Sequence, residues 1–203
     1  NFEDKFARFL NKLLAELMTK YILIPTINAV KGDILKLNSA IVVSDIPKFD
    51  FKELDQAQLE AGIQNPHRNV VRMLLKTLAY KHQDSLLPSK WEIEHIFPQK
   101  WQTNYFIDES DNKIREKIEH IGNKLPFEKK LNIIAGNGYF AKKKKEYAAS
   151  KIEITKSIGL SEIQEWDLES ISKRDIRISD CIVAILKKWN NEYSVITKGI
   201  ALN

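Results

Sequence analysis

Apolar residues recur every three or four positions along much of the chain, which is the spacing of one face of an amphipathic helix. This pattern predicts helices over residues 2–20, 26–42 and 53–63. Asn65-Pro66 then opens a further helix that runs to about His82, because proline is favoured in a first turn. We therefore expect the first ninety residues to be helical.

The pattern changes after Pro88. Trp91-Glu92-Ile93-Glu94 alternates apolar and charged residues, as a short half-buried strand does, and Pro98 ends it. A polar loop is expected over 102–113, a short helix over 114–120 and a second strand over 121–127. Proline cannot donate a ladder hydrogen bond, so Pro126 predicts that the second strand is short.

The rest of the chain is again predicted to be helical. Residues 128–131 lead into a helix or turn around Asn132, Gly136-Asn137-Gly138 breaks the chain, a basic helix covers 139–151, and two helical patterns lie between 161 and 189. These patterns indicate an α+β fold that is mostly α-helical. We divide it into an N-terminal helical region (1–88), a central module (89–151) and a C-terminal helical region (152–203) packed on that module.

Composition narrows the class of protein. The chain has 203 residues, 43% of them hydrophobic and 29% charged, and no apolar run is long enough to cross a bilayer. The single cysteine, Cys181, excludes an internal disulfide and a paired-cysteine zinc site. The sequence begins without Met and without a secretion signal, so we expect a cytoplasmic piece of a longer protein with no membrane segment.

Charge is unevenly distributed. Residues 91–119 hold 4 Lys/Arg against 7 Asp/Glu, whereas residues 120–151 hold 8 against 2. An acidic stretch followed by a basic one is expected where a cation pocket adjoins a phosphate-binding surface. The residues predicted to contact nucleic acid are Lys124, Lys129, Lys130, Asn137, Lys142, Lys143, Lys144 and Lys145. On a helix at most two of the last four can follow one phosphate chain, and the alternative is a solvated surface.

Three residue types in order suggest phosphodiester hydrolysis. His95, in its neutral form, can take a proton from water. Glu94 directly before it and Asn132 further along supply hard oxygen ligands suited to Mg²⁺, or to Mn²⁺. Glu92 is an alternative to Glu94 as the acidic ligand.

Two other asparagines and a second histidine are candidates for supporting roles. Asn123 follows a glycine, and we expect its amide to cross-link the loop that carries His95 and so to orient the catalytic group. Asn137 either binds phosphate or caps the helix from Tyr139, and the cap is favoured. His120 is expected at the surface or in a supporting position.

At these residues the sequence resembles the HNH, or ββα-metal, nucleases. The segment Ile93-Glu94-His95-Ile96-Phe97-Pro98 corresponds to the first strand, Gly122-Asn123 to the second, and Leu131-Asn132 to the helix. With Asn137-Gly138-Tyr139-Phe140 and the lysine-rich helix, the chain is similar to the C-terminal nuclease domain of GmrSD-type restriction endonucleases.

The resemblance implies a DNA endonuclease of phage defence in which His95 activates water, Glu94 and Asn132 hold a divalent ion, and cleavage leaves a 5′-phosphate. It also implies a nucleotide-binding and sensing domain or subunit outside these residues. Two departures are visible. Glutamate stands where many relatives have aspartate, and Pro126 stands where they often have Leu-Thr-Leu.

Two other functions stay open at this point. One is a nucleic-acid-binding module whose catalytic site has decayed, which the intact Glu94-His95 pair disfavours. The other is an RNA-directed nuclease, because hydrolysis by a histidine and a metal does not itself read the sugar.

Overall fold

The computed structural model describes residues 2–44, 47–49, 51, 55–102 and 109–200, with residues 194–200 described by their backbone only. Residues 53–54 of one predicted helix and 103–108 of the predicted polar loop lie outside this set. The chain forms two compact units: residues 1–62 with 180–203, and residues 63–179. These boundaries differ from the three regions expected from the sequence.

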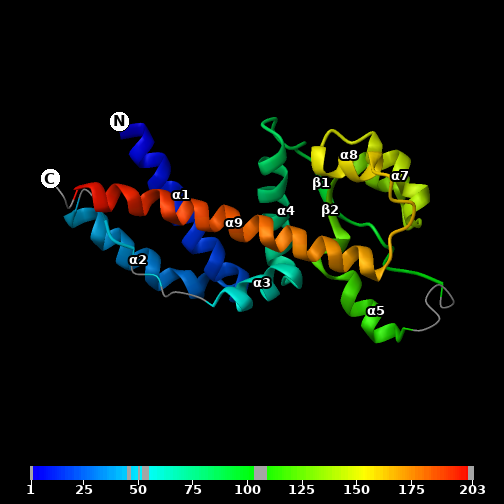
Figure 1. Ribbon diagram of the computed structural model, residues 1–203, viewed down its shortest axis with the longest axis horizontal. Helices are drawn as coiled ribbons and strands as arrows, with labels where there is room; N and C mark the ends of the chain where they lie inside the picture. Colours follow the sequence, from blue (N-terminus) through cyan, green and yellow to red (C-terminus); the bar gives the residue numbers. More distant parts are fainter. Residues whose placement is uncertain (1, 45–46, 50, 52–54, 103–108, 201–203) are drawn as a thin grey trace. The chain divides into compact units, whose positions relative to one another are not determined.

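The first unit is built from helices. Helix α1 (Phe2–Leu23) packs on α2 (Ile27–Val43), and the unit also takes most of α3 (Gln56–Gln64) and the second part of α9 (Leu168–Ile200) (Figure 1). The apolar face of α1 buries Ala15, Met18 and Ile22. The predicted periodicity therefore does mark the buried face of this helix.

The second unit holds a small sheet surrounded by helices. Strand β1 (Trp91–His95) follows helix α4 (Arg68–His82) and pairs antiparallel with β2 (Lys124–Glu128). Within the described residues the sheet consists of these two strands. His95 lies opposite Lys124 and Glu94 opposite Leu125. A turn of 3-10 helix, η1 (Ile121–Asn123), leads directly into β2, so the two predicted strands meet at the residues expected to carry chemistry.

The remaining elements of this unit cover the sheet. They are α5 (Asp111–Ile118), α6 (Lys129–Ala135), α7 (Phe140–Ala148), α8 (Glu153–Leu160) and the first part of α9. Helix α7 packs on α6 and α8, and α8 also contacts β2 (Figure 1). Aromatic rings fill the core between them: Phe127 meets Tyr147 edge-on with ring centroids 5.1 Å apart, and Phe140 lies 5.5 Å from Trp166. This packing holds α7 against β2 and against the segment that contains Trp166.

The mostly helical α+β class is confirmed, and two details differ from the expectation. Helix α8 was not predicted, and residues 161–167, expected to begin a helix, contain none. Leu168 instead begins the long α9, which absorbs both later apolar patterns. Pro126 lies within β2, which has five residues. Among the described residues no helix is long and apolar enough to span a lipid bilayer.

Candidate functional site

A pocket of about 280 Å³ opens at the end of β1. It is lined by residues from the strand, the loop after it, α6, the turn before α7, and α7 itself: Ile93, Glu94, His95, Pro98, Gln99, Asn132, Gly136, Asn137 and Lys143. The structure thus brings together five of the predicted site residues: Glu94, His95, Asn132, Asn137 and Lys143. The residues proposed for catalysis and metal binding among them, Glu94, His95 and Asn132, are up to 38 positions apart in the chain (132 minus 94).

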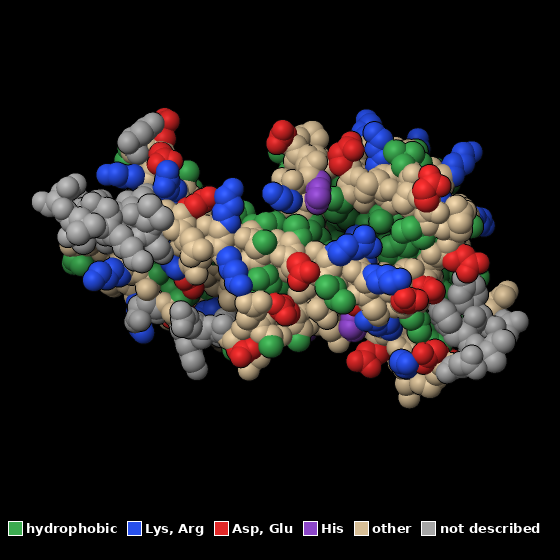
Figure 2. Space-filling view, viewed as in Figure 1, with side chains coloured by type: hydrophobic (Ala, Val, Ile, Leu, Met, Phe, Trp, Pro, Cys, Tyr) green, Lys and Arg blue, Asp and Glu red, His purple; other side chains and the backbone are tan. Residues whose placement is uncertain are grey.

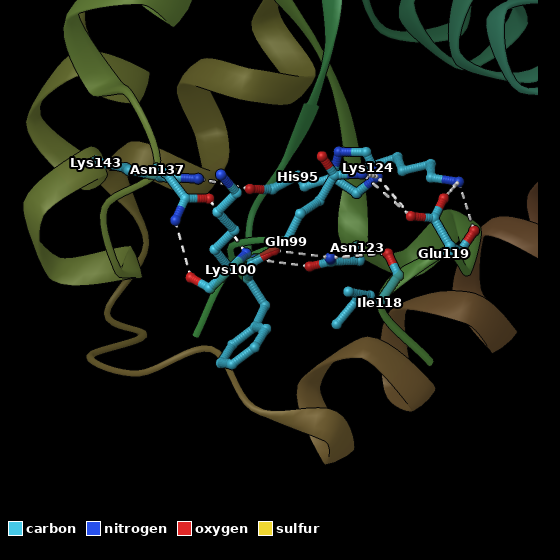
Figure 3. A network of polar contacts seen from close by, with 10 residues as sticks. His95, Gln99, Lys100, Ile118, Glu119, Asn123, Lys124, Asn137 and Lys143 are labelled. Carbon is cyan, nitrogen blue, oxygen red and sulfur yellow. Dashed lines mark hydrogen bonds and ion pairs between the residues drawn. The ribbon is translucent and has the colours of Figure 1, made fainter. Parts of the chain in front are cut away.

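The imidazole of His95 is mostly enclosed, with 18% of the side chain exposed. Its Nε2 lies 3.5 Å from Oε1 of Glu119 and 3.5 Å from the amide nitrogen of Gln99 (Figure 3). Burial lowers the pKa of His95 below its ordinary value, and nearby Lys124 acts in the same direction, while Glu119 partly opposes both. A lowered pKa keeps the ring neutral at pH 7, which is the form that accepts a proton.

Glu119, beside His95, is fixed by Lys124. The ammonium of Lys124 lies 2.9 Å from Oε2 of Glu119 and also donates to its backbone carbonyl. Burial acts to raise the pKa of Glu119, but the bond and charge of Lys124 outweigh it, so the pKa lies below the ordinary value. Glu119 is therefore ionised at neutral pH, and it faces the ring nitrogen as an acceptor.

Asn123 lies behind the loop that follows His95 and is fully buried. Its Oδ1 accepts a 2.7 Å hydrogen bond from the backbone N–H of Phe97, and its Nδ2 donates to the carbonyls of Phe97 and Ile118, both at 3.0 Å (Figure 3). One side chain thus satisfies three backbone groups. The amide cross-links the loop two residues beyond His95, which is the contact that an orienting residue requires.

The turn that carries Asn123 is held from behind by Arg174 of α9. This buried guanidinium donates to the carbonyls of Gly122 and Lys124, each at 2.8 Å, and to that of Ile121 at 3.3 Å. Burial lowers the pKa of Arg174 to about 10, so the group remains charged at neutral pH and its bonds are charge-assisted.

Asp175, the next residue of α9, contacts the same turn, and we call Arg174 and Asp175 together the α9 clamp. Its Oδ1 accepts from the N–H of Gly122 at 2.7 Å, and its Oδ2 lies 2.8 Å from both Lys117 and His120. A Cβ at Gly122 would lie 2.2 Å from the carbonyl oxygen of Ile171, so only glycine allows this approach. His120 thus takes the supporting position considered from the sequence.

Glu94 lies between the pocket and the protein interior, with a relative exposure of 6%. Its Oε1 accepts from the ammonium of Lys143 and from the hydroxyl of Tyr147, each at 2.6 Å. Lys143 donates as well to the backbone carbonyl of His95 at 2.6 Å. Burial and Glu94 raise the pKa of Tyr147, so its hydroxyl keeps the proton that it donates. Both partners use one oxygen, which leaves Oε2 of Glu94 available.

Asn137 fastens the far end of the same loop. Its Nδ2 donates to the carbonyl of Lys100 at 2.8 Å, and its Oδ1 accepts from the N–H of Lys100 at 3.4 Å (Figure 3). The favoured prediction that Asn137 caps the next helix is wrong, because Tyr139 is the N-cap residue of α7 and no side chain caps that end. Asn123 and Asn137 instead hold the loop at two points.

The lysines predicted to contact nucleic acid separate into two groups. Lys124 and Lys143 are buried and ion-paired, and Lys144 donates to the carbonyl of Ile163. The exposed ones are Lys129, Lys130, Lys142 and Lys145. Figure 2 shows several basic side chains over the part of the second unit where α7 and α8 lie. Lys142 and Lys145 are three residues apart, so they share one helix face.

The donor set of the pocket suits a hard cation. Glu94 offers Oε2 and Asn132 offers an amide oxygen. Within the described ranges no three or more His, Cys, Asp or Glu side chains come together as a metal site, so these two oxygens are the ligands to consider. Mg²⁺ accepts such oxygens and retains several waters, so two protein ligands are sufficient for it. The ammonium of Lys143 weakens the attraction of Glu94 for a cation, so binding is expected to be weak.

Sequence reasoning missed most of the groups that surround these residues. Glu119, Tyr147, Arg174 and Asp175 were not singled out, and Lys143 was assigned to the surface. One signal was present: Arg174 and Asp175 lie between Ile171 and Ile178, at the spacing that buries one face of a helix. Charged residues on an apolar face need buried partners, which here are the backbone groups of η1.

A comparison with known families identifies the kind of domain. The family model of the GmrSD restriction endonucleases, C-terminal domain, matches residues 48–180, which is more than half of the chain. No curated protein and no solved structure matches the chain. The matched range contains every residue of the pocket and of the α9 clamp. The chain therefore belongs to the family of GmrSD restriction endonuclease C-terminal domains and is a nuclease domain of that kind.

Proposed function

We propose that this domain is a divalent-metal-dependent DNA endonuclease of the HNH type, with His95 as the group that takes a proton from water. The observation that carries the proposal is the pocket itself, because it joins a proton acceptor to two oxygen ligands. The neutral state of His95, favoured by burial, supports this role.

In this mechanism the water oxygen attacks phosphorus while its proton passes to the imidazole of His95. The bond between phosphorus and the 3′ oxygen breaks, and that oxygen takes a proton from solvent water, which leaves a 5′-phosphate and a 3′-hydroxyl. Asn123 and Asn137 hold the loop that begins at His95, so the ring keeps its position relative to the pocket. Glu94 and Asn132 would hold the divalent ion, most simply Mg²⁺, which when bound neutralises charge that develops on the phosphate.

Binding of the DNA backbone is assigned to the exposed lysines near the pocket. Lys142 and Lys145 share one face of α7, and Lys129 and Lys130 begin α6, the helix that also carries Asn132. Contacts of this kind depend on charge rather than on base sequence, so affinity should fall steeply with added salt. Recognition of modified DNA would then rest with a nucleotide-binding and sensing domain or subunit outside residues 1–203. We place this activity in the cytoplasm.

The test is a nicking assay on supercoiled plasmid with and without Mg²⁺. We expect His95→Ala to lower the rate by at least about a hundredfold, as loss of a general base does, while gel-shift affinity for DNA changes little. His82→Ala is the matched control, because His82 is exposed at the end of α4 and does not line the pocket.

Three outcomes would contradict the proposal. Cleavage by His95→Ala at the wild-type rate would remove His95 from the mechanism. DNA binding with no cleavage under any divalent ion would favour the decayed binding module, and cleavage of RNA alone in parallel reactions would reassign the substrate.

A further inference from the structure

The amide of Asn132 is held by a second glutamate of the same strand. Its Nδ2 donates to Oε2 of Glu92 at 3.1 Å. Glu92 stands two residues before Glu94, so the two side chains leave β1 on the same face. Its other oxygen, Oε1, lies 3.6 Å from the ammonium of Lys129. Glu92 is thus itself positioned by a neighbour on α6.

The chemistry of this contact fixes which way the amide faces. An ionised carboxylate can only accept hydrogen bonds, so the group of Asn132 that meets Glu92 has to be the NH₂. The carbonyl oxygen then points away from Glu92. Asn132 lines the pocket beside Glu94, and Glu92 does not. The side-chain oxygen of Asn132, Oδ1, has no hydrogen-bond partner within the described part of the chain, which leaves it available to the pocket.

We propose that Glu92 is a positioning residue for the cation site: it holds the amide of Asn132 so that the carbonyl oxygen, and not the NH₂, faces the cation. This inference rests on the proposed function. A rotated amide would direct two N–H donors at the cation and would repel it. The two glutamates of β1 therefore have different roles, Glu94 as a ligand and Glu92 as the partner that orients another ligand.

Calorimetric titration with Mn²⁺ alone tests the proposal without any cleavage reaction. Glu92→Ala removes the acceptor, and we expect the dissociation constant to rise at least about tenfold, as loss of an outer partner of a metal ligand does. Glu92→Gln removes the same charge but keeps a carbonyl oxygen that can accept from Asn132, so its constant should stay within about threefold of wild type. The Glu92 side chain is 42% exposed, so both variants should fold, which circular dichroism checks.

Glu169→Ala serves as the charge-matched control. Glu169 is exposed, pairs with Lys173 on α9 and does not line the pocket, so its loss changes net charge alone. We expect wild-type affinity. Equal weakening in Glu92→Gln and Glu92→Ala would show that Glu92 acts through its charge or as a ligand and would overturn the proposal. Wild-type affinity in Glu92→Ala would also overturn it.

The orienting role of Glu92 can be tested a second time in the Asn132→Asp variant. Asn132→Asp presents oxygen on both sides of the side chain, so it needs no orienting partner. Adding Glu92→Ala to this variant should weaken Mn²⁺ affinity by no more than about threefold, because only a nearby carboxylate charge is lost and no ligand needs orienting. A tenfold loss there would contradict the orienting role. Absence of Mn²⁺ and Mg²⁺ binding in the wild type would instead overturn the proposed metal site, a failure distinguishable from failure of the Glu92 proposal alone.

Discussion

The turn η1 and the helix α6 each carry an asparagine of the site, and they differ in how firmly that side chain is held. Asn123 in η1 is fully buried and makes three hydrogen bonds to backbone groups. The side chain of Asn132 in α6 is partly exposed, and within the described residues it makes one hydrogen bond, to a carboxylate that is itself partly exposed. We therefore expect the region that holds His95, the proposed proton acceptor, to be rigid, and the region proposed to meet a cation to stay open to water, as ligand exchange requires.

The difference also shows in what stands behind each residue. The turn η1 is backed by Arg174 and Asp175, whose buried charges bind its carbonyls and one of its N–H groups. Helix α6 has only seven residues and exposes Ile133 and Ile134. Burial of charge at η1 is costly unless every group is paired, so this side of the site should tolerate substitution poorly.

The largest effect is expected from Gly122→Ala. The added Cβ would lie 2.2 Å from a backbone oxygen of α9 and 2.6 Å from Asp175, so the helix or the turn has to move. We expect a loss of about 3 kcal/mol or more in the free energy of unfolding, measured by urea denaturation. Gly32→Ala is the control, because nothing lies near a Cβ there and α2 should gain about 0.5–1 kcal/mol. Equal stability of Gly122→Ala and wild type would refute the close approach.

Loss of the Arg174 guanidinium should have the second-largest effect on stability. Arg174→Met keeps much of the side-chain volume but leaves carbonyls of η1 without their donor. A loss of about 2–3 kcal/mol in unfolding free energy is expected, together with slower nicking, because Asn123 loses its fixed support. Lys173→Met, at the exposed neighbouring position, should change neither quantity. Unchanged stability of Arg174→Met would mean that the clamp contributes nothing.

The two asparagines provide the most direct test of the comparison. Asn123→Ala strands three buried backbone groups and should lower the unfolding free energy by about 2–3 kcal/mol. Asn132→Ala should lower it by less than about 0.5 kcal/mol, since one partly exposed bond is lost. Both should abolish nicking. Similar stability losses in the two variants would show that the distinction between a rigid and an open region is mistaken.

The smallest effect concerns pH. Because the pKa of His95 lies below 6.5, nicking should persist at pH 6.5 and fall only as the pH drops through the lowered value and the ring gains its proton. Glu119→Gln removes an influence that raises this pKa, so the acid limb of the rate profile should move to lower pH. Lys124→Met should move it the other way. Each shift should be small, since a single charge near solvent is worth about 1 kcal/mol or less. Shifts of opposite sign would contradict the assignment.

The sequence predicted the elements well where one period dominated. The apolar spacing in α1 and α4 and the alternation in β1 were sufficient to place those elements. It did not predict α8, a short amphipathic helix whose N-cap residue Ile152 makes no side-chain bond and whose first N–H group donates instead to distant Gln83. It also placed a helix before Leu168, although Trp166 is buried there in a loop against Phe140. Tertiary packing decided both cases.

The order of residues in the sequence predicted which side chains line the pocket, but it did not predict the partners that surround them. Glu94, His95 and Asn132 line one pocket as expected, because short elements on either side of β2 bring them together. Partners of Glu94 and His95 include Lys143 and Tyr147 of α7 and Glu119 after α5, at separations that no local pattern encodes. Lys143 illustrates the limit: within a run of four lysines it looks like a surface residue, yet its ammonium pairs with Glu94.

The loop after β1 is held by side chains instead of by a backbone ladder, and this has a consequence for solvent exchange. The N–H of Phe97 lies outside any helix or strand, yet it donates to buried Asn123. Its hydrogen should therefore exchange with deuterium as slowly as those of the sheet itself. We therefore expect a single amide side chain to give an irregular segment the opening energy of a strand, and His95, the proposed proton acceptor at the start of this segment, to share that resistance to unfolding.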